Sequence, residues 1–399
     1  MRSYQTAKIN RRPIKVLFIS HTSGRLGAEK SLLLLLKNID RKLVEPIVVV
    51  PGPGPLKEQI HDLNIRTYNV WSPPWVRPKT AEAGSCRGII KEMVQEMVAV
   101  FRLCRIISTE RVAAVYTNTA VKISGAIGAF IVKKPHLWHI REIIRANPNL
   151  HSLLPEKMLF RLISKTSDII IANSNATAAQ FDGTNSNGRI RVIYNAVEPG
   201  EPNKSDCLVN IGGVRSTDWI VAVIGQLLER KAQDDAIRAV KIAEKEIPNM
   251  RLLVIGEGNT DYKNYLKQLA SELDVVDHVI FTGYRDDVPQ ILPNCRLLLV
   301  PSWNEPFGRT VIEAMAAGIP VIGANSGGLK EVIRNKASGY LVPPKNPAEI
   351  AEKMIYLFHH PDIAKQMGAE GKKLTKENFS IQNYTESIQN AVEEVISAT

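Results

Sequence analysis

Two carboxylates, Glu305 and Glu313, stand eight positions apart within residues 301–322, which read PSWNEPFGRTVIEAMAAGIPVI. Carboxylates accept hydrogen bonds from hydroxyl groups, as the recognition of a sugar requires. Gly308, between them, lets the backbone come close to a ligand. Each glutamate alone is as compatible with an ordinary role as with a ligand contact. The ordinary role is a loop acid for Glu305 and a charge at the helix start for Glu313. The complete string favours a ligand site.

The elements around these residues would position them at the end of a sheet. An apolar strand at 296–301 is followed by a polar turn and by a helix that begins near Thr310, where apolar residues recur at helical spacing. Gly318 ends the helix, Pro320 prevents its return, and a second apolar strand follows. Such turns lie at the carboxyl ends of strands, where ligands bind. The start of the helix attracts phosphate.

The pattern E-P-F-G-x-x-x-x-E-A-M-A-x-G-x-P-V-I of residues 305–322 resembles the nucleotide-sugar site of the retaining glycosyltransferases of family 4 (glycosyl transferases group 1). The resemblance extends over most of the chain, more weakly in the N-terminal half. It implies an α/β protein of the GT-B fold, in which two Rossmann-like doubly wound domains face each other across a cleft. In that fold the C-terminal helix crosses back to the first domain.

The resemblance also implies roles for residues on the donor side. Glu305 would hold donor-sugar hydroxyls and Glu313 the ribose. Residues 224–231 are similar to the motif G-R-L-x-x-x-K of the family, in which Arg and Lys bind the donor diphosphate. Lys231 matches, Gln226 replaces the usual Arg, and Arg230 is the candidate to compensate. Fixed cations would stabilise the departing diphosphate. Further donor contacts are expected from Tyr284, Arg285, Phe307, Gly308, Arg309 and Thr310.

In the N-terminal half, the loop before the first helix is similar to the Gly-Gly-x-Glu loop of the family, which faces the donor. Gly27 and Glu29 match that loop, but Leu26 replaces its first glycine.

His139 resembles a family histidine that touches the donor sugar from the opposite domain, and we count it with Glu305 and Lys231 as catalytic. A structural histidine is the alternative. The neighbouring Arg141 and Glu142 would lie near the acceptor or pair with each other.

A chain of 399 residues exceeds the usual size of one hydrophobic core. We expect a first domain at 1–197 with residues 381–399 packing on it, a Pro- and Gly-rich linker at 198–218, and a donor-binding domain at 219–380. Strands alternating with helices predict a parallel sheet in each domain. The expected strands are 14–20, 44–50, 112–116, 136–140, 169–172, 191–194, 219–225, 251–256, 278–281, 297–300 and 320–323, and two of the expected helices are 30–38 and 381–397.

Positive charge is concentrated in the first half of the chain. Residues 1–200 contain 29 Lys and Arg against 14 Asp and Glu, a balance of +15, whereas residues 201–399 contain 22 against 26, a balance of −4. An anionic partner for the first half follows, either a membrane surface, a phosphorylated acceptor or nucleic acid, unless the charge only solubilises. No nucleic-acid motif is present, so nucleic acid is not expected.

Two tryptophans flank the prolines of residues 71–75, and residues 88–107 are apolar at helical spacing. Tryptophan favours membrane–water interfaces. For the helix alone, packing against the sheet is the favoured interpretation. The loop and the charge together favour reversible contact with an anionic membrane surface.

The sequence therefore predicts a hexosyltransferase of polysaccharide biosynthesis that acts with retention of configuration. Its donor would be a UDP- or GDP-sugar, and its acceptor a glycan, a lipid-linked molecule or a small molecule. No cofactor is required, and no cluster of metal ligands is evident. Residues 1–13 do not resemble a signal peptide and no run approaches ~20 apolar residues, so we expect a cytoplasmic enzyme, peripheral at the inner membrane surface if the charge serves that contact.

Three other functions remain open. A nucleotide-sugar 2-epimerase shares the fold but needs no acceptor. A non-catalytic relative could bind anions or nucleic acid through its basic half. An inactive relative is conceivable because Leu26 and Gln226 depart from the motifs of the family.

Overall fold

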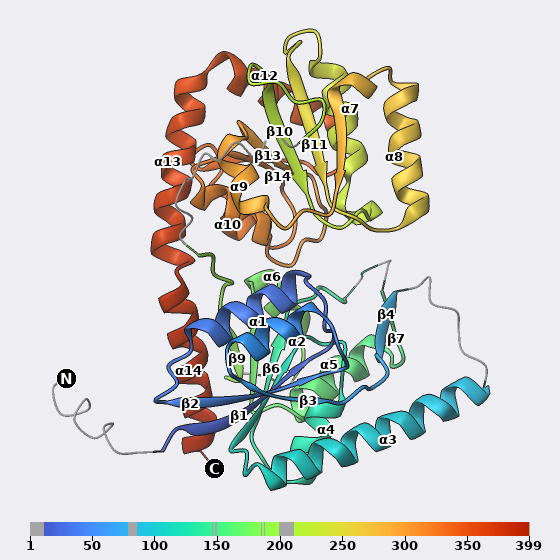
Figure 1. The fold of residues 1–399 in the computed structure, drawn as a ribbon, viewed down its shortest axis with the longest axis vertical. Coiled ribbons are helices and arrows are strands. Elements are labelled where there is room, and N and C mark those ends of the chain that lie inside the picture. Colours follow the sequence, from blue (N-terminus) through green and yellow to red (C-terminus); the bar gives the residue numbers. More distant parts are fainter. Residues whose placement is uncertain are drawn as a thin grey trace, which may run out of the picture. The chain divides into compact units, whose positions relative to one another are not determined.

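A computed structural model describes residues 12–78, 86–145, 147, 150–184, 186, 188–198 and 211–398. The chain divides into two compact units (Figure 1). Unit 1 contains residues 1–194 together with 381–399, and unit 2 contains residues 195–380. Most of the linker predicted at 198–218 and most of the polar segment at 1–13 lie outside the described residues. The domain boundaries drawn from the sequence remain a prediction.

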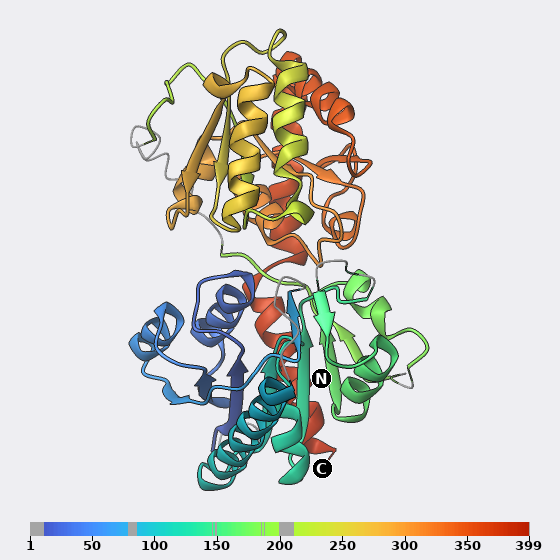
Figure 2. The same ribbon diagram turned by 90° about the vertical axis from the view of Figure 1, so that its right-hand side faces the viewer.

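Unit 1 is built around a parallel sheet of seven strands in the order β3-β2-β1-β5-β6-β8-β9. Its central strands are almost wholly buried because helices flank both faces (Figures 1 and 2). A two-stranded antiparallel ribbon pairs β4 (Val76–Pro78) with β7 (Leu150–Ser152). The sheet strands are β1 (Ile14–Ser20), β2 (Val44–Val50), β3 (Arg66–Asn69), β5 (Ala114–Asn118), β6 (His136–Ile140), β8 (Ile169–Ala172) and β9 (Ile190–Val192).

The α-helices of unit 1 lie between these strands in sequence, except α14, which follows unit 2 in the chain. They are α1 (Gly27–Asn38), α2 (Pro55–Asp62), α3 (Cys86–Thr109), α4 (Ser124–Ile131), α5 (Glu156–Lys165), α6 (Asn175–Ala178) and α14 (Ile381–Ser397).

Unit 2 repeats the same architecture with six parallel strands in the order β12-β11-β10-β13-β14-β15. The strands are β10 (Trp219–Ile224), β11 (Met250–Ile255), β12 (Val279–Gly283), β13 (Leu297–Val300), β14 (Val321–Ala324) and β15 (Gly339–Val342). The α-helices are α7 (Gln233–Ala243), α8 (Thr260–Glu272), α9 (Val288–Ile291), α10 (Arg309–Ala316), α11 (Leu329–Val332), α12 (Pro347–His359) and α13 (Pro361–Asn378).

The doubly wound α/β class and its two sheets are as predicted, with small shifts of element ends. The strand expected at 112–116 begins at Ala114, because the Val112 N–H instead bonds the Ile107 carbonyl and closes the end of α3. The helix expected at 30–38 begins earlier, at Gly27.

The last helix, α14, belongs to unit 1 although the 186 residues of unit 2 precede it, as predicted from the resemblance. The Asp40 N–H donates to the Gln389 side-chain oxygen at 3.2 Å, and Arg141 donates to the Tyr384 hydroxyl at 2.9 Å. These contacts hold α14 against the loops that follow α1 and β6 in unit 1.

Candidate functional site

At the carboxyl end of the unit 2 sheet, Lys231 and Glu305 form an ion pair. Lys231 Nζ lies 2.6 Å from Glu305 Oε2, and Arg230 Nη1 lies 3.8 Å from the same oxygen. The side chains of Lys231 and Glu305 are only 17% and 12% exposed. The structure thus brings together three residues that the sequence placed in two separate motifs, one after β10 and one after β13.

Burial and ion pairing shift the pKa of the Glu305 carboxyl in opposite directions. Burial would raise the pKa of Glu305, but the charges of Lys231 and Arg230 outweigh it and hold the pKa below its ordinary 4.5. Burial lowers the pKa of Lys231, with Glu305 opposing that shift. Glu305 is therefore ionised at neutral pH, and its negative charge favours the protonated form of Lys231.

The position of Lys231 is set by the backbone around it. The aliphatic part of the Lys231 side chain packs over Gly225, whose φ is +154°. A Cβ at this glycine would lie 3.7 Å from Lys231 Cε. The Trp303 N–H donates to the Arg230 carbonyl at 3.1 Å, which links the two loops of the site. Gln226, which stands where the family has Arg, is exposed, and its backbone oxygen accepts from Gln233 at 3.0 Å.

Glycines let two loops pack against each other beside Glu305. The Gly328 N–H donates to the Glu305 carbonyl at 2.8 Å, and a Cβ on Gly328 would lie 2.3 Å from the Pro306 oxygen. Gly308 has φ +96°, and a Cβ there would lie 2.6 Å from Leu329. Only glycine fits these positions without movement of the backbone.

The predicted helix after the turn is α10, which begins at Arg309, one residue before the expected Thr310. Gly308 precedes it and supplies no side chain to cap its first N–H groups. Arg309 Nη2 lies 2.9 Å from Glu313 Oε1, one helical turn away. The N-terminus of α10 therefore offers backbone N–H groups and a cation to an anion.

Three other predicted donor residues have different surroundings. The Phe307 ring is buried, edge-on to Phe379 at 5.7 Å, so it supports the turn from inside unit 2. Tyr284 is 45% exposed and donates to Asp286 at 2.8 Å. Arg285 donates from Nε to Asp287 at 2.8 Å. Donor contacts through these residues remain predictions.

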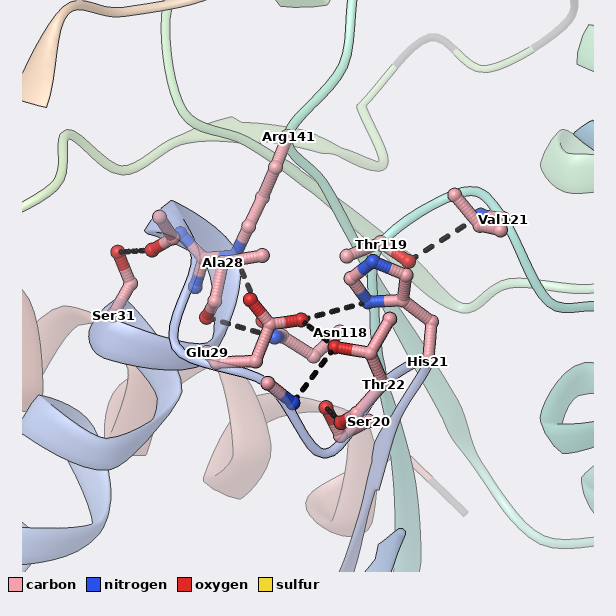
Figure 3. Close-up of polar contacts among 12 residues, drawn as sticks. Ser20, His21, Thr22, Ala28, Glu29, Ser31, Asn118, Thr119, Val121 and Arg141 are labelled. Carbon is pink, nitrogen blue, oxygen red and sulfur yellow. Dashed lines mark hydrogen bonds and ion pairs between the residues drawn. The ribbon is translucent and has the colours of Figure 1, made fainter. Parts of the chain in front are cut away.

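In unit 1, a second polar cluster gathers at the ends of β1 and β5 and at the start of α1 (Figure 3). Glu29 is 1% exposed, and its Oε1 accepts from the Thr22 hydroxyl at 2.6 Å and lies 3.4 Å from His21 Nδ1. Its other oxygen, Oε2, is buried and has no hydrogen-bond partner among the described residues. Asn118 donates to the Ala28 carbonyl at 3.1 Å and holds the first turn of α1, which begins at Gly27.

His139, predicted to be catalytic, lies inside unit 1 rather than at its surface. Its exposure is 0%, its Nδ1 is bonded to the Tyr116 hydroxyl, and Arg141 Nη2 lies 3.3 Å from the same nitrogen. Burial, with the nearby Arg141 charge, holds the pKa of His139 well below its ordinary value, so the ring is neutral. These surroundings favour the structural alternative, and the catalytic role remains a prediction.

Arg141 and Glu142 do not form a simple side-chain pair. Arg141 donates from Nε to Asn118 at 2.7 Å, while Glu142 Oε2 accepts the N–H groups of Ala120 and Arg141, each at 3.1 Å. Burial raises the pKa of Glu142 against the charge of His21. Sequence reasoning missed His21, Thr22 and Asn118, although each stands at or just after the end of an apolar strand.

Among the described residues, no three His, Cys, Asp or Glu side chains are grouped so that they could hold a metal ion. The same residues contain no helix long and apolar enough to cross a membrane.

Two family descriptions match consecutive parts of the chain. Glycosyltransferase Family 4 matches residues 26–201, and Glycosyl transferases group 1 matches residues 208–374. Together they span both units and include every predicted site residue.

Individual proteins match at lower identity. An uncharacterised glycosyltransferase of Methanocaldococcus jannaschii is 35% identical over 173 residues, which cover 41% of this chain and 43% of that protein. N-acetyl-alpha-D-glucosaminyl L-malate synthase of Bacillus anthracis is 28% identical over 240 residues, which cover 59% of this chain and 61% of the synthase. The chain thus spans about half the length of these curated relatives.

Among solved structures, Anabaena HepE in complex with UDP-glucose matches with a TM-score of 0.78 at 22% identity. The match covers 97% of this chain and 100% of that one. This likeness extends over both units and shows a shared fold.

Proposed function

We propose that this chain, which belongs to the group 1 glycosyl transferases of family 4 and has their GT-B fold, transfers a hexose from a nucleotide sugar with retention of configuration. The observation that carries the proposal is the Lys231–Glu305 pair beside the uncapped start of α10. Phosphate-binding groups and a hydroxyl-binding carboxylate then lie within one site. UDP- and GDP-sugars are both candidate donors, and HepE, which binds UDP-glucose, favours UDP.

In this proposal the diphosphate of the donor takes the place of Glu305 as the partner of Lys231. The departing nucleoside diphosphate gains negative charge in the transition state, and the Lys231 ammonium, the Arg230 guanidinium and the N–H groups of α10 stabilise that charge. Glu305 then accepts hydrogen bonds from the hydroxyls of the donor sugar, and Glu313 from the ribose. The usual Arg at position 226 is replaced by Gln, and Arg230, 3.8 Å from Glu305, supplies a cation in its place.

Unit 1 contributes the acceptor side in the proposal. Glu29 belongs instead to the loop that resembles the donor-facing loop of the family. Its buried Oε2 lacks a partner among the described residues, and a sugar hydroxyl would satisfy it. The acceptor is a glycan, a lipid-linked molecule or a small molecule. The +15 balance of residues 1–200 supports a reversible contact of this unit with an anionic membrane surface.

The first test is a thermal-shift panel of UDP- and GDP-sugars. A ligand present at ~100 times its Kd stabilises a protein by about 2.7 kcal/mol, which shifts the melting temperature measurably. We expect one nucleotide sugar and its nucleoside diphosphate to stabilise the chain. If no nucleotide sugar raises the melting temperature of the chain, the proposal is refuted.

The second test uses the stabilising donor labelled in its sugar. Transfer of label to an added glycan or lipid acceptor identifies a transferase. Conversion of the donor to an isomer without acceptor identifies a 2-epimerase instead. Binding without either reaction identifies an inactive relative.

A further inference from the structure

Helix α3 exposes a long apolar face. Along Cys86–Thr109, seven large apolar side chains are between 47% and 71% exposed. Their positions recur at intervals of one, three or four, so they form one continuous stripe along the helix. The seven residues, which we call the α3 face, are Ile89, Ile90, Met93, Val94, Met97, Val98 and Phe101.

The α3 face is unusual because the same helix directs acids inward. Glu92 Oε2 pairs with Arg77 Nη2 at 2.8 Å, and both carboxylate oxygens of Glu96 are buried. Only the C-terminal half of α3 packs apolar residues into the core, through Ala99, Leu103 and Ile107. In Figure 1 the N-terminal half of the helix extends past the sheet. The sequence-based expectation that the apolar side of 88–107 packs on the sheet therefore holds only for its last turns.

The neighbouring helix α4 adds to the exposed apolar surface. Gly128 of α4 packs against Leu103 of α3, and the two helices run side by side in Figure 2. At the end of α4, Phe130 and Ile131 are 72% and 57% exposed. Nine of the nineteen exposed large apolar side chains of the described residues lie on these two helices. An exposed apolar area this concentrated indicates an interaction site.

All exposed charges on the described part of α3 are positive. Arg87, Lys91, Arg102 and Arg105 are exposed, whereas Glu92 and Glu96 are partly buried. Arg87 and Arg105 are 18 residues apart, which is five turns at about 3.6 residues per turn, so they project from the same edge of the helix. Lys133 and Lys134 follow α4 and are exposed too. Apolar residues bordered by cations are typical of a helix that lies in the surface of an anionic bilayer.

We propose that the α3 face, extended by the end of α4, inserts into the headgroup region of an anionic lipid bilayer. This inference rests on the membrane contact within the proposed function and names the surface that makes it. The basic edge would contact lipid phosphates while the apolar stripe enters the acyl boundary. A second copy of the chain suits this surface less well, because a two-fold interface would place the same cationic edge opposite itself.

The test measures flotation of the full chain with vesicles of phosphatidylcholine, with and without phosphatidylglycerol. We expect binding to the anionic vesicles at about 0.05 M salt and release at about 0.5 M, where the Debye length is much shorter. The variant Ile90→Ser/Met97→Ser/Phe101→Ser should bind anionic vesicles at least about tenfold more weakly, since its insertion surface is lost. Its fold should be kept, because all three side chains are exposed.

Two matched control variants separate this surface from general effects. Ile242→Ser/Val276→Ser/Tyr356→Ser removes three exposed apolar side chains of unit 2, and should bind as the wild type does. Lys91→Gln/Arg102→Gln/Arg105→Gln should reduce both the affinity and its salt dependence, whereas Lys365→Gln/Lys373→Gln/Lys376→Gln on the exposed side of α13 should not.

Three outcomes overturn the proposal in different ways. Equal binding of the wild type and the α3-face variant to anionic vesicles keeps the membrane contact but rejects this surface. No binding of the wild type to anionic vesicles rejects both, while donor binding is tested separately by thermal shift. A dimer in sedimentation velocity that the α3-face substitutions dissolve assigns the surface to a second copy instead.

Discussion

Lys231 and Glu305 pair with each other across two loops of unit 2, with Nζ and Oε2 2.6 Å apart. The cation proposed for the diphosphate of the donor is therefore held, before any donor binds, by the acid proposed for the sugar. The pair stabilises both charges in a site where each is more than four-fifths buried. In the proposed mechanism, donor binding would exchange the Glu305 carboxylate for the donor diphosphate as the partner of Lys231.

The pairing predicts that the two residues are coupled in stability. Glu305→Gln and Lys231→Met should each lower the free energy of unfolding by about 1–3 kcal/mol, because each leaves a buried group without its partner. The double variant should cost less than the sum of the two single changes. Urea unfolding of the four proteins measures the coupling. Strictly additive losses would mean that the ion pair contributes nothing in solution.

Removal of the cation should weaken leaving-group stabilisation. Lys231→Ala should lower kcat/KM roughly 30- to 1000-fold. This factor corresponds to a loss of about 2–4 kcal/mol in transition-state stabilisation, as for other contacts to transition-state charge. The nucleoside diphosphate product should also bind more weakly. The control is Arg238→Ala on α7, where Arg238 donates to the Tyr265 hydroxyl. It should leave kcat/KM and the affinity for the nucleoside diphosphate near wild type. Unchanged product inhibition in Lys231→Ala would contradict the assigned role.

The two glutamates of residues 301–322 should both affect transfer. Glu305→Ala and Glu313→Ala should each reduce turnover by ~10²-fold or more, because a site built to bind a hydroxyl loses heavily when that pairing is broken. Steady-state rates with the preferred donor measure the effect. Burial of Glu305 adds a loss of stability that the sequence did not suggest, so activity is compared at a temperature where both variants are folded. Wild-type turnover in both variants would refute the assignment.

Gly308 should tolerate no side chain. Gly308→Ala places a Cβ 2.6 Å from Leu329 at φ +96°, and we expect a loss of about 1–3 kcal/mol in the free energy of unfolding. Donor affinity should fall as well, because the residue starts α10. Gly212→Ala is the control, since no atom lies within 4 Å of its added Cβ. Equal stability of the two variants would show that the turn adapts easily.

Glu96 should make stability depend on pH in an unusual direction. Burial raises the pKa of this carboxyl from 4.5 to about 7, with the Lys122 charge opposing the shift. Between those values the folded state binds a proton that the unfolded state has lost. The free energy of unfolding should therefore fall as the pH rises from about 4.5 to about 7. Glu96→Gln should remove this component.

Urea unfolding at several pH values measures the slope for the wild type and for Glu96→Gln. Glu386→Gln, at an exposed position of α14, is the matched control and should keep the wild-type slope. An identical slope in the wild type and in Glu96→Gln would show that Glu96 is ionised in the folded protein.

Local patterns in the sequence determined the class of the fold. The strands β8 and β13 were predicted as 169–172 and 297–300, because a strand buried on both faces is typically a continuous apolar run. The C-terminal helix was likewise predicted as Ile381–Ser397. The segment from Glu305 to Glu313 was predicted as a ligand site because its two acids and Gly308 lie close together in the chain. Its role in binding a donor remains a prediction.

Only the tertiary structure decided which distant residues meet and which side of each element is exposed. The sequence assigned Lys231 and Glu305 to separate contacts, and only the parallel pairing of β10 with β13 brings their loops together. The residues around His139 in the sequence did not show that the His139 ring is buried in contact with Arg141 and Tyr116. Burial depends on residues from other strands, such as Tyr116 on β5. Helical spacing in 88–107 predicted an apolar face without its direction. That direction is set where Ala99, Leu103 and Ile107 pack into the core. Arg77 pairs with Glu92 of the same helix, and the apolar face of the N-terminal half is left exposed.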